Sequence, residues 1–291
     1  MRTRTVPLEA LEAVLEEEWV DRTRRPYVQG DLCYVPVREG FFSDTALPER
    51  TPYRGPGYQM VGDIALIHGT APPDEELEAL VAWKQPRGVL LVEGFEGTLR
   101  TSRTRLLWGE CGEVCHCEEG IRYRLDPERV MFSQGNREEK ARIAALIRQS
   151  ASPERVADMF AGIGYFTLPA ARAGARVHAM ELNPAAFGYL QSNIRENGVA
   201  AQVHAECGDC RDLLDGPYDR IIMGHFDASL MLEAALRHAE SGTVLHVHSI
   251  GPASNIQTLI ENAGYSWDIR VYRVKKYGPH RWHVVQDVIL S

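Results

Sequence analysis

Hydrophobic and polar residues follow a regular rhythm after Pro153, where short apolar runs alternate with stretches that have helical spacing. Strands are expected at 155–160, 176–181, 201–205, 220–223 and 243–248, and helices at 166–173, 184–196, 228–240 and 252–263. This alternation predicts an α/β domain with a doubly wound parallel sheet. Two further apolar runs, 267–274 and 283–290, follow without a helix between them and predict an antiparallel edge.

The first 130 residues have a shorter and less regular pattern. An amphipathic helix is expected over 8–20, where apolar residues recur at helical spacing and glutamates fill the opposite face. Further strands are expected at 32–37, 64–68, 88–93, 103–108 and 121–125, and further helices at 74–83 and 137–148. The chain is therefore expected to form a small α+β domain over 1–130 and the α/β domain over 131–291.

Composition agrees with a globular chain. Its 291 residues, of which 44% are hydrophobic, can bury a sizeable core, and this length favours two domains. No apolar run reaches the roughly 20 residues that cross a bilayer, so no membrane partner is expected. The N-terminus leads into an acidic amphipathic stretch and not into an apolar signal segment, which predicts a cytoplasmic protein.

The cysteines and histidines do not predict a disulfide scaffold or a metal site. Six cysteines stand unevenly at 33, 111, 115, 117, 207 and 210, which favours reduced thiols. The group at 111–117 lacks the paired spacing of a zinc knuckle, and Cys207 with Cys210 offers only two ligands. His246 and His248 share one face of an expected strand, where buried core or pocket histidines are more common than metal ligands. No metal is therefore expected.

The charge pattern bears on binding to nucleic acid. A net charge of −8 argues against indiscriminate binding to polyanions. Basic residues nevertheless gather at Arg100, Arg103 and Arg105, and again at Arg270, Arg273, Lys275, Lys276 and Arg281. Each group predicts a local positive patch that fits either a nucleic-acid contact or a merely solvated face.

A candidate cofactor site follows the first strand of the α/β domain. The segment Asp158-Met-Phe-Ala-Gly-Ile-Gly164 lies between that strand and the next helix, where glycines let the backbone approach a ligand. Glu181 ends the second strand, where an acid reaches a ribose diol, and Asp209 follows the third, where it can meet an adenine amino group. Thr167 replaces the third glycine of a dinucleotide motif, and the aromatic pair before it suits a smaller nucleoside. The pattern therefore favours S-adenosylmethionine over a nicotinamide dinucleotide.

With these residues in place, the chain resembles the archaeal tRNA 4-demethylwyosine aminocarboxypropyltransferases, a sister family of the tRNA guanosine-37 N1-methyltransferases. Four segments carry the resemblance, namely 123–140, 158–164, 219–225 and 275–283. The resemblance extends from about residue 58 to the C-terminus and is specific over 123–291. It implies a class I methyltransferase-like Rossmann domain at the C-terminal end, preceded by an α+β domain that contacts tRNA.

Two departures from the methyltransferase pattern separate the sister families. Where the methyltransferases carry Pro-Arg in the linker motif and Asn-x-Pro after the fourth strand, this chain has Gln134-Gly135 and Met223-Gly224-His225. The resemblance therefore implies transfer of the 3-amino-3-carboxypropyl group to C7 of 4-demethylwyosine at position 37 of tRNA-Phe, with release of 5′-methylthioadenosine. tRNA guanosine-37 N1-methylation is the alternative. A non-catalytic binding module is a third reading, which the intact set of site residues disfavours.

The resemblance also implies roles for individual residues. Ser133 and Lys140 are expected to hold the methionine end of S-adenosylmethionine, with Lys140 lacking the bidentate fork of the arginine that is usual there. The remaining cofactor contacts are expected from Phe160, Gly162, Gly164, Glu181, Asp209 and Cys210. His225 is expected to act mainly by positioning, with acceptance of the C7 proton as a further role. The anticodon region of the tRNA is expected to contact Arg100, Arg103, Lys275 and Lys276.

Overall fold

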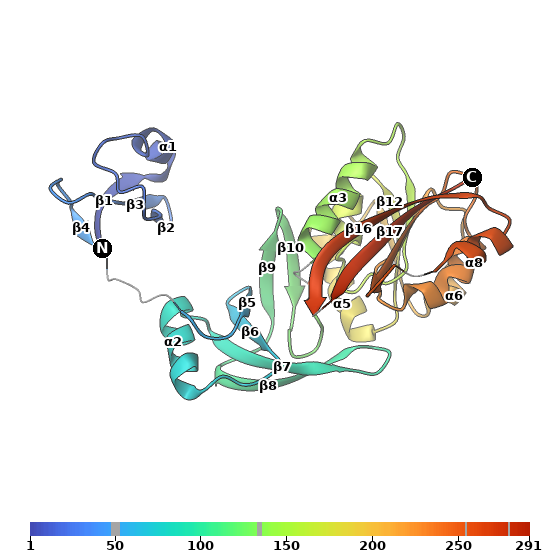
Figure 1. Cartoon of the computed structure of the whole chain (residues 1–291), viewed down its shortest axis with the longest axis horizontal. Coiled ribbons are helices and arrows are strands. Elements are labelled where there is room, and N and C mark those ends of the chain that lie inside the picture. Colours follow the sequence, from blue (N-terminus) through green and yellow to red (C-terminus); the bar gives the residue numbers. More distant parts are fainter. Residues whose placement is uncertain (48–52, 133–135, 254, 279) are drawn as a thin grey trace. The chain divides into compact units, whose positions relative to one another are not determined.

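The computed structural model describes residues 1–47, 53–132, 136–253, 255–278 and 280–291, and Figure 1 labels its helices and strands. They form two compact units, one made of Met1–Gly55 with Pro73–Gln85 and the other of Pro56–Pro72 with Pro86–Ser291. The predicted domain boundary after residue 130 lies inside the second unit and stays a prediction. None of the described helices is long and apolar enough to cross a membrane.

The first unit is built on a small antiparallel sheet in the order β2-β3-β1-β4. Its strands are β1 (Arg2–Pro7), β2 (Tyr27–Gln29), β3 (Leu32–Pro36) and β4 (Thr45–Ala46). The unit also holds the 3-10 turn η1 (Leu8–Ala10) and the helices α1 (Leu11–Val14) and α2 (Asp74–Lys84). Its buried cluster consists of three valines and Cys33, against which apolar residues of α1 pack.

The helix expected over 8–20 is much shorter in the structure and ends with α1. Trp19 still packs against the core, but it reaches that position through turns. Val20 pairs with Val37 in a β-bridge, which draws the chain into an extended path. The three glutamates 16–18 would stand at the C-terminal end of a longer helix, where the helix dipole disfavours negative charge.

The second unit contains a four-stranded sheet in the order β5-β6-β7-β8. Its strands are β5 (Tyr58–Val61), β6 (Ile64–His68), β7 (Gly88–Glu96) and β8 (Thr101–Gly109), and among them only β6 and β7 pair in parallel. A hairpin of β9 (Val114–Glu118) and β10 (Ile121–Leu125) follows. Ile64 of this sheet and Tyr123 of the hairpin belong to the same buried cluster as Ile163 of the α/β part, so these parts share one core.

The α/β part contains a seven-stranded sheet in the order β13-β12-β11-β14-β15-β17-β16. Its strands are β11 (Arg155–Asp158), β12 (Arg176–Glu181), β13 (Val203–Cys207), β14 (Arg220–Met223), β15 (Val244–Ile250), β16 (Trp267–Gly278) and β17 (Arg281–Leu290). The first five in this order are parallel, whereas β17 is antiparallel to both β15 and β16. The predicted parallel sheet with an antiparallel edge is therefore confirmed.

Helices cover both faces of this sheet. They are α3 (Arg137–Arg148), α4 (Thr167–Arg172), α5 (Pro184–Glu196), α6 (Cys210–Leu213), the turn η3 (Ala228–Met231), α7 (Leu232–Leu236) and α8 (Gln257–Asn262). Val156 and Ala157 of β11 belong to different buried clusters, because neighbouring side chains of a strand point to opposite faces. One cluster contains residues of α3, α4 and α5, and the other contains residues of α6, α7 and α8. The sheet is therefore doubly wound, as predicted.

Two predicted helices of the α/β part are also shorter than expected. The stretch 228–240 forms η3 and α7, which ends at Leu236. Beyond it the carbonyl of His238 accepts a hydrogen bond from the amide of Tyr218, 3.1 Å away, so the chain turns back to cover the segment before β14. The stretch 252–263 becomes helical only from Gln257.

Candidate functional site

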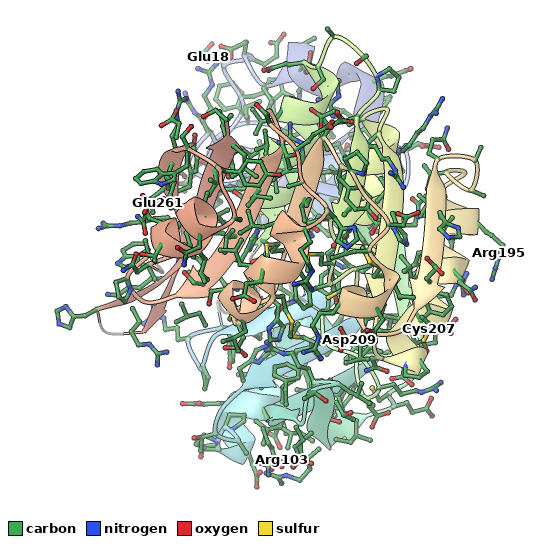
Figure 2. The ribbon with its side chains drawn as sticks, turned by 90° about the vertical axis from the view of Figure 1, so that its right-hand side faces the viewer. Glu18, Arg103, Arg195, Cys207, Asp209 and Glu261 are labelled. Atoms are coloured by element: carbon green, nitrogen blue, oxygen red, sulfur yellow. The ribbon has the colours of Figure 1, made fainter. Side chains whose placement is uncertain are left out.

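A cavity of about 690 Å³ opens at the carboxyl ends of the parallel strands. Its wall is formed mainly by the loops after β11, β12, β13 and β14, together with the tip of the β7–β8 hairpin. Figure 2 shows Asp209 and Cys207 at this end of β13, and Arg103 on the β7–β8 hairpin. Ligands of doubly wound sheets bind in this position. The predicted site residues that line the cavity are Phe160, Gly162, Glu181, Asp209, Cys210, His225 and Arg100.

Glu181 ends β12 with its carboxylate at the cavity wall. One carboxylate oxygen accepts a hydrogen bond from the amide of Gly162, and the other accepts one from the amide of Asn183, each at 2.7 Å. Burial raises the pKa of this carboxyl above its ordinary value, and the backbone amides partly offset that effect. Each oxygen keeps a further lone pair, so the carboxylate can accept hydrogen bonds from the two hydroxyls of a ribose.

The two motif glycines serve different purposes. Gly162 lines the cavity at φ +58°, and a Cβ atom there would lie 2.6 Å from the ring of Tyr165. Gly164 has φ +106° and does not line the cavity, since a Cβ atom there would meet Leu168 of α4 at 2.8 Å. Gly162 therefore makes room for the ring of Tyr165 at the cavity wall, whereas Gly164 permits close packing of the following helix.

Thr167, which stands where a dinucleotide motif has its third glycine, has a structural role in this chain. Its hydroxyl donates to the buried carboxyl of Asp158 at 2.7 Å, just beneath the cofactor loop. Burial raises the pKa of Asp158 to about 6, although the bond from Thr167 opposes that shift. A third glycine at this position would leave the buried carboxyl without this donor.

Asp209 and Cys210 close the cavity beyond β13. Asp209 caps α6 by accepting from the amide of Arg211 at 2.9 Å, and it also pairs with the guanidinium of Arg211 at 2.5 Å. The side-chain hydrogen bond from Arg211 lowers the pKa of Asp209 and keeps it ionised. Burial raises the pKa of Cys210 to about 11, so this residue is a neutral thiol at the cavity wall.

His225 stacks on Phe160, with 5.3 Å between ring centroids. Burial and then the charge of Arg100 lower the pKa of His225, so the ring is neutral near pH 7. Its Nδ1 atom accepts from the amide of Asp227 at 3.2 Å, whereas Nε2 lies 3.5 Å from Nη1 of Arg100. With Nδ1 already engaged, the contacts of His225 favour the predicted positioning role over acceptance of a proton.

Arg100 lies at the tip of the β7–β8 hairpin and faces the cavity instead of a solvated patch. Its guanidinium carbon is 5.4 Å from the ring centroid of Phe95 and 5.6 Å from that of Phe226. Its buried Nε atom has no hydrogen-bond partner among the described residues, and Nη1 lies 3.5 Å from Nε2 of His225. Arg100 is thus a cation between two aromatic rings, with a donor still available to an anionic ligand.

The other predicted basic contacts lie outside the cavity. Arg103 is exposed and pairs with Glu93 and Glu96, each at 3.5 Å. Lys275 and Lys276 are on β16, where burial lowers the pKa of Lys275. The structure therefore separates Arg100 from the other three predicted tRNA contacts.

Lys140 also lies outside the cavity. Its ammonium pairs with the carboxylate of Glu118 on β9, and both side chains are 4% exposed. The rings of Tyr123 and Tyr165 lie 5.3 and 5.9 Å from the ammonium. Ser133, the other residue expected at the methionine end, lies outside the described residues, as do Gln134 and Gly135.

Two asparagines of the site were missed by sequence reasoning. Asn183 caps α5 and donates from Nδ2 to the carbonyl of Leu99 at 3.0 Å, which ties the hairpin tip to the end of β12. The Asn183-Pro184 pair is a recognisable signal for the start of a helix, but the sequence does not show that Asn183 contacts the hairpin. Asn136 lines the cavity with a buried Oδ1 atom that has no partner within the described part of the chain, an acceptor that fits a polar ligand.

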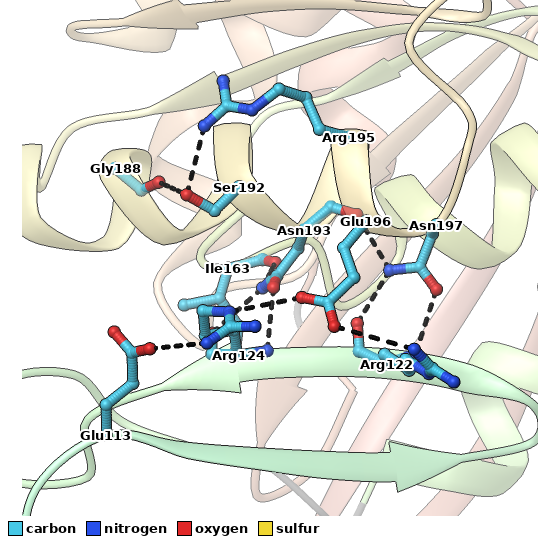
Figure 3. Close-up of polar contacts among 10 residues, drawn as sticks. All are labelled: Glu113, Arg122, Arg124, Ile163, Gly188, Ser192, Asn193, Arg195, Glu196 and Asn197. Atoms are coloured by element: carbon cyan, nitrogen blue, oxygen red, sulfur yellow. Dashed lines mark hydrogen bonds and ion pairs between the residues drawn. The ribbon is translucent and has the colours of Figure 1, made fainter.

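Two further asparagines, Asn193 on α5 and Asn197 at its C-cap, hold the β9–β10 hairpin against the cofactor loop (Figure 3). Asn193 accepts from the amide of Arg124 at 2.7 Å and donates to its carbonyl at 3.1 Å, and Asn197 does the same with Arg122 at 3.0 and 2.7 Å. Nδ2 of Asn193 also donates to the carbonyl of Ile163 at 3.0 Å. The fully buried Asn193 therefore connects the hairpin to the glycine motif.

Comparison with known proteins agrees with this geometry. Residues 114–266 match the family model of the TRM5/TYW2 methyltransferase domain. A tRNA(Phe) (4-demethylwyosine(37)-C(7)) aminocarboxypropyltransferase of Methanocaldococcus jannaschii is 34% identical over 243 residues, which cover 79% of this chain and 96% of that protein.

Two solved structures are similar over most of the chain. M. jannaschii TYW2 in complex with AdoMet has a TM-score of 0.64 at 31% identity and covers 81% of this chain and 99% of that one. Trm5b from Pyrococcus abyssi has a TM-score of 0.73 at 27% identity and covers 99% of each chain. Since the family model spans more than half of its residues, this chain belongs to the TRM5/TYW2 family.

Proposed function

We propose that this chain transfers the 3-amino-3-carboxypropyl group of S-adenosylmethionine to C7 of 4-demethylwyosine at position 37 of tRNA-Phe. A relative with this activity in its name is 34% identical to the chain, and a structural relative of 31% identity was crystallised with AdoMet. The cavity fits such a ligand, because Glu181 suits a ribose diol and Phe160 and Gly162 line the wall beside it. A tRNA substrate also supports the expected cytoplasmic location.

The side chains of the loop after β14 favour aminocarboxypropyl transfer over methylation of guanosine N1. Gly224 lines the cavity, and a Cβ atom there would lie 3.1 Å from the ring of Phe166. Methylation of guanosine N1 needs a base for the N1 proton and a donor that stabilises the developing negative charge. In this loop Nδ1 of His225 accepts from the amide of Asp227, the Phe226 side chain has no polar atom, and the carboxylate of Asp227, which lines the cavity, is 72% exposed and therefore solvated. The loop therefore suits a carbon nucleophile better than guanosine N1.

The proposed chemistry is a displacement at a sulfonium. C7 of the base attacks Cγ of the methionine chain, the Cγ–S bond breaks, and its electron pair stays on sulfur in 5′-methylthioadenosine. The C7 proton then leaves to a base or to water. All three carbons on the sulfonium are electrophilic, so the product depends on which carbon faces the nucleophile in line. The residues of this chain act by orientation, with Glu181 fixing the nucleoside end and the aromatic wall excluding water.

Arg100 is the proposed tRNA contact nearest to the reacting base. The other arginine of the cavity wall, Arg211, is paired with Asp209, whereas Arg100 makes no ion pair within the described part of the chain. Its position between two rings suits a phosphate or base of the anticodon loop. Arg103, Lys275 and Lys276 are proposed as further contacts to the tRNA backbone.

S-adenosylmethionine labelled separately in the methyl and carboxyl carbons tests the reaction. The full chain is incubated with tRNA-Phe carrying 4-demethylwyosine and, in parallel, with tRNA-Phe carrying guanosine at position 37. We expect carboxyl label in the first tRNA only, together with 5′-methylthioadenosine. Methyl label in the second tRNA, with release of S-adenosylhomocysteine, would instead establish methylation of guanosine, the activity that the likeness to Trm5b keeps as the second candidate.

A further inference from the structure

Three metal-ligating side chains converge at the open edge of the seven-stranded sheet. His178 on β12 and His204 on β13 are direct partners in the parallel pairing, and Glu206 stands two residues after His204 on the same face. One ligand atom from each residue lies within 4.8 Å of the other two. Oε2 of Glu206 is 2.7 Å from Nε2 of His178 and 3.3 Å from Nε2 of His204.

The ring of His178 is held in one orientation from behind. Its Nδ1 atom lies 2.7 Å from the hydroxyl of Tyr218, which itself donates to Asp215 at 2.7 Å. When the single hydroxyl proton is used in that bond, the tautomer of His178 that satisfies Tyr218 is the one with Nδ1 as the donor. In the neutral ring, Nε2 then carries a lone pair that points at the carboxylate of Glu206.

Nε2 of His178 and Oε2 of Glu206 lie 2.7 Å apart, so an ion bound by both would move them apart to about 3.3 Å, the ligand spacing of a tetrahedral zinc site. Ligating histidines commonly donate their other ring N–H to a fixed acceptor, as His178 does to Tyr218. The geometry behind the ring is therefore that of a metal ligand.

The site is open to an ion from solvent. The His178 side chain is 6% exposed, whereas those of Glu206 and His204 are 37% and 72% exposed. Asp215 adds a second carboxylate, which Arg155 neutralises at 2.8 Å, so Glu206 remains as an uncompensated charge beside the two rings. Two imidazoles with one carboxylate suit Zn²⁺ and neighbouring transition metals and do not suit Mg²⁺ or Ca²⁺.

We propose that His178, His204 and Glu206 form a transition-metal site that takes Zn²⁺, with water as the fourth ligand. The ion would link the edge strand β13 to β12. β13 runs directly into the Gly208–Arg211 segment of the cavity wall, so the ion would also steady one side of the cofactor cavity. The sequence alone does not predict this site, because it depends on the register in which β12 and β13 pair.

Zn²⁺ titration of the full chain without an affinity tag, followed by calorimetry and by thermal melting, tests the site. We expect one Zn²⁺ per chain, a rise in Tm with Zn²⁺ but not with Mg²⁺, and a d–d absorption band with Co²⁺. His204→Ala removes a ligand that is mostly exposed, so the fold is expected to survive while Zn²⁺ affinity falls at least tenfold. Glu206→Gln is expected to weaken binding as well.

His280→Ala and Cys207→Ser are the matched controls, since both residues are exposed and lie outside the three ligands. Both variants are expected to bind Zn²⁺ like the unchanged chain. Absence of stoichiometric Zn²⁺ binding would overturn the proposal. Equal affinity in His204→Ala would do so too, and loss of binding in Cys207→Ser would assign the ion to thiols instead.

Discussion

Replacement of Glu181 by alanine is expected to weaken the binding of S-adenosylmethionine strongly. The carboxylate accepts the amides of Gly162 and Asn183 at 2.7 Å and has lone pairs left for a ribose diol. Loss of two charge-assisted hydrogen bonds to the ribose costs roughly 2–4 kcal/mol, which is about a 30- to 700-fold rise in Kd. Because the same carboxylate also holds one amide in each of the loops after β11 and β12, the upper part of this range is expected.

Calorimetric titration with two ligands makes the measurement specific. S-adenosylmethionine and 5′-methylthioadenosine share the ribose but differ in the methionine chain, so Glu181→Ala is expected to weaken both by a similar factor. Glu261→Ala is the matched control, because Glu261 lies on α8 (labelled in Figure 2) and outside the cavity wall. Glu181→Gln is expected to bind with intermediate affinity, since its amide group must face one of the two backbone donors.

Two results would refute this account of Glu181. Unchanged affinity for both ligands would remove the residue from the site. A loss confined to S-adenosylmethionine would place it at the methionine end instead of the ribose. The melting temperature of the variant separates either result from a general failure to fold.

Three further predictions concern stability and tRNA. Burial and, to a lesser extent, the charge of Lys275 lower the pKa of His283 to about 4. Because the unfolded chain then binds a proton more readily than the folded one, protonation of His283 should reduce the free energy of unfolding by at most about 3 kcal/mol as the pH falls from about 6.5 to about 4. Denaturant titrations should show a shallower acid loss in His283→Gln. Thr167→Val should cost about 1–3 kcal/mol in the same assay, because the buried carboxyl of Asp158 loses its donor. Arg100→Gln and Arg103→Gln should each reduce the slope of log affinity for tRNA against log salt by about one.

Asp158 titrates in the same pH range as His283, so the effect of His283 is measured as the difference between the variant and the unchanged chain. The pKa of Asp158 is raised to about 6, so its protonation favours the folded state as the pH falls and opposes the effect of His283. The exposed residues His280 and Thr101 supply the matched controls, His280→Gln and Thr101→Val. An equal acid loss in His283→Gln and the unchanged chain, or equal stability of Thr167→Val and Thr101→Val, would contradict these predictions. An unchanged salt slope in Arg100→Gln would separate Arg100 from phosphate contacts.

The α/β half of the fold follows from the sequence because its apolar runs alternate with amphipathic helices of ordinary length. The strand expected at 176–181 and the helix expected at 184–196 have the observed bounds. In the N-terminal half the pattern is harder to interpret, since β1 (Arg2–Pro7) buries Thr3 together with Val6. These two buried residues stand three positions apart and one of them is polar, so the strand lacks the alternation on which prediction depends.

The backbone of the candidate site was predictable, but several side-chain positions were not. Glu181 and Gly162 follow from their places at strand ends, which every doubly wound sheet brings together. Lys140 is instead engaged by Glu118, a buried partner on another element, and the guanidinium of Arg100 lies between Phe95 and Phe226. Such contacts depend on the tertiary pairing of elements, which local sequence patterns do not encode.

The asparagine contacts of α5 have a consequence for the solubility of the chain. A two-stranded hairpin leaves the outer edge of each strand with unpaired backbone groups, and such edges recruit strands from other molecules. On β10 the outward amides and carbonyls of Arg122 and Arg124 are occupied by Asn197 and Asn193. The side-chain amides thus take the place of a third strand, and this edge is protected against intermolecular β-pairing and aggregation.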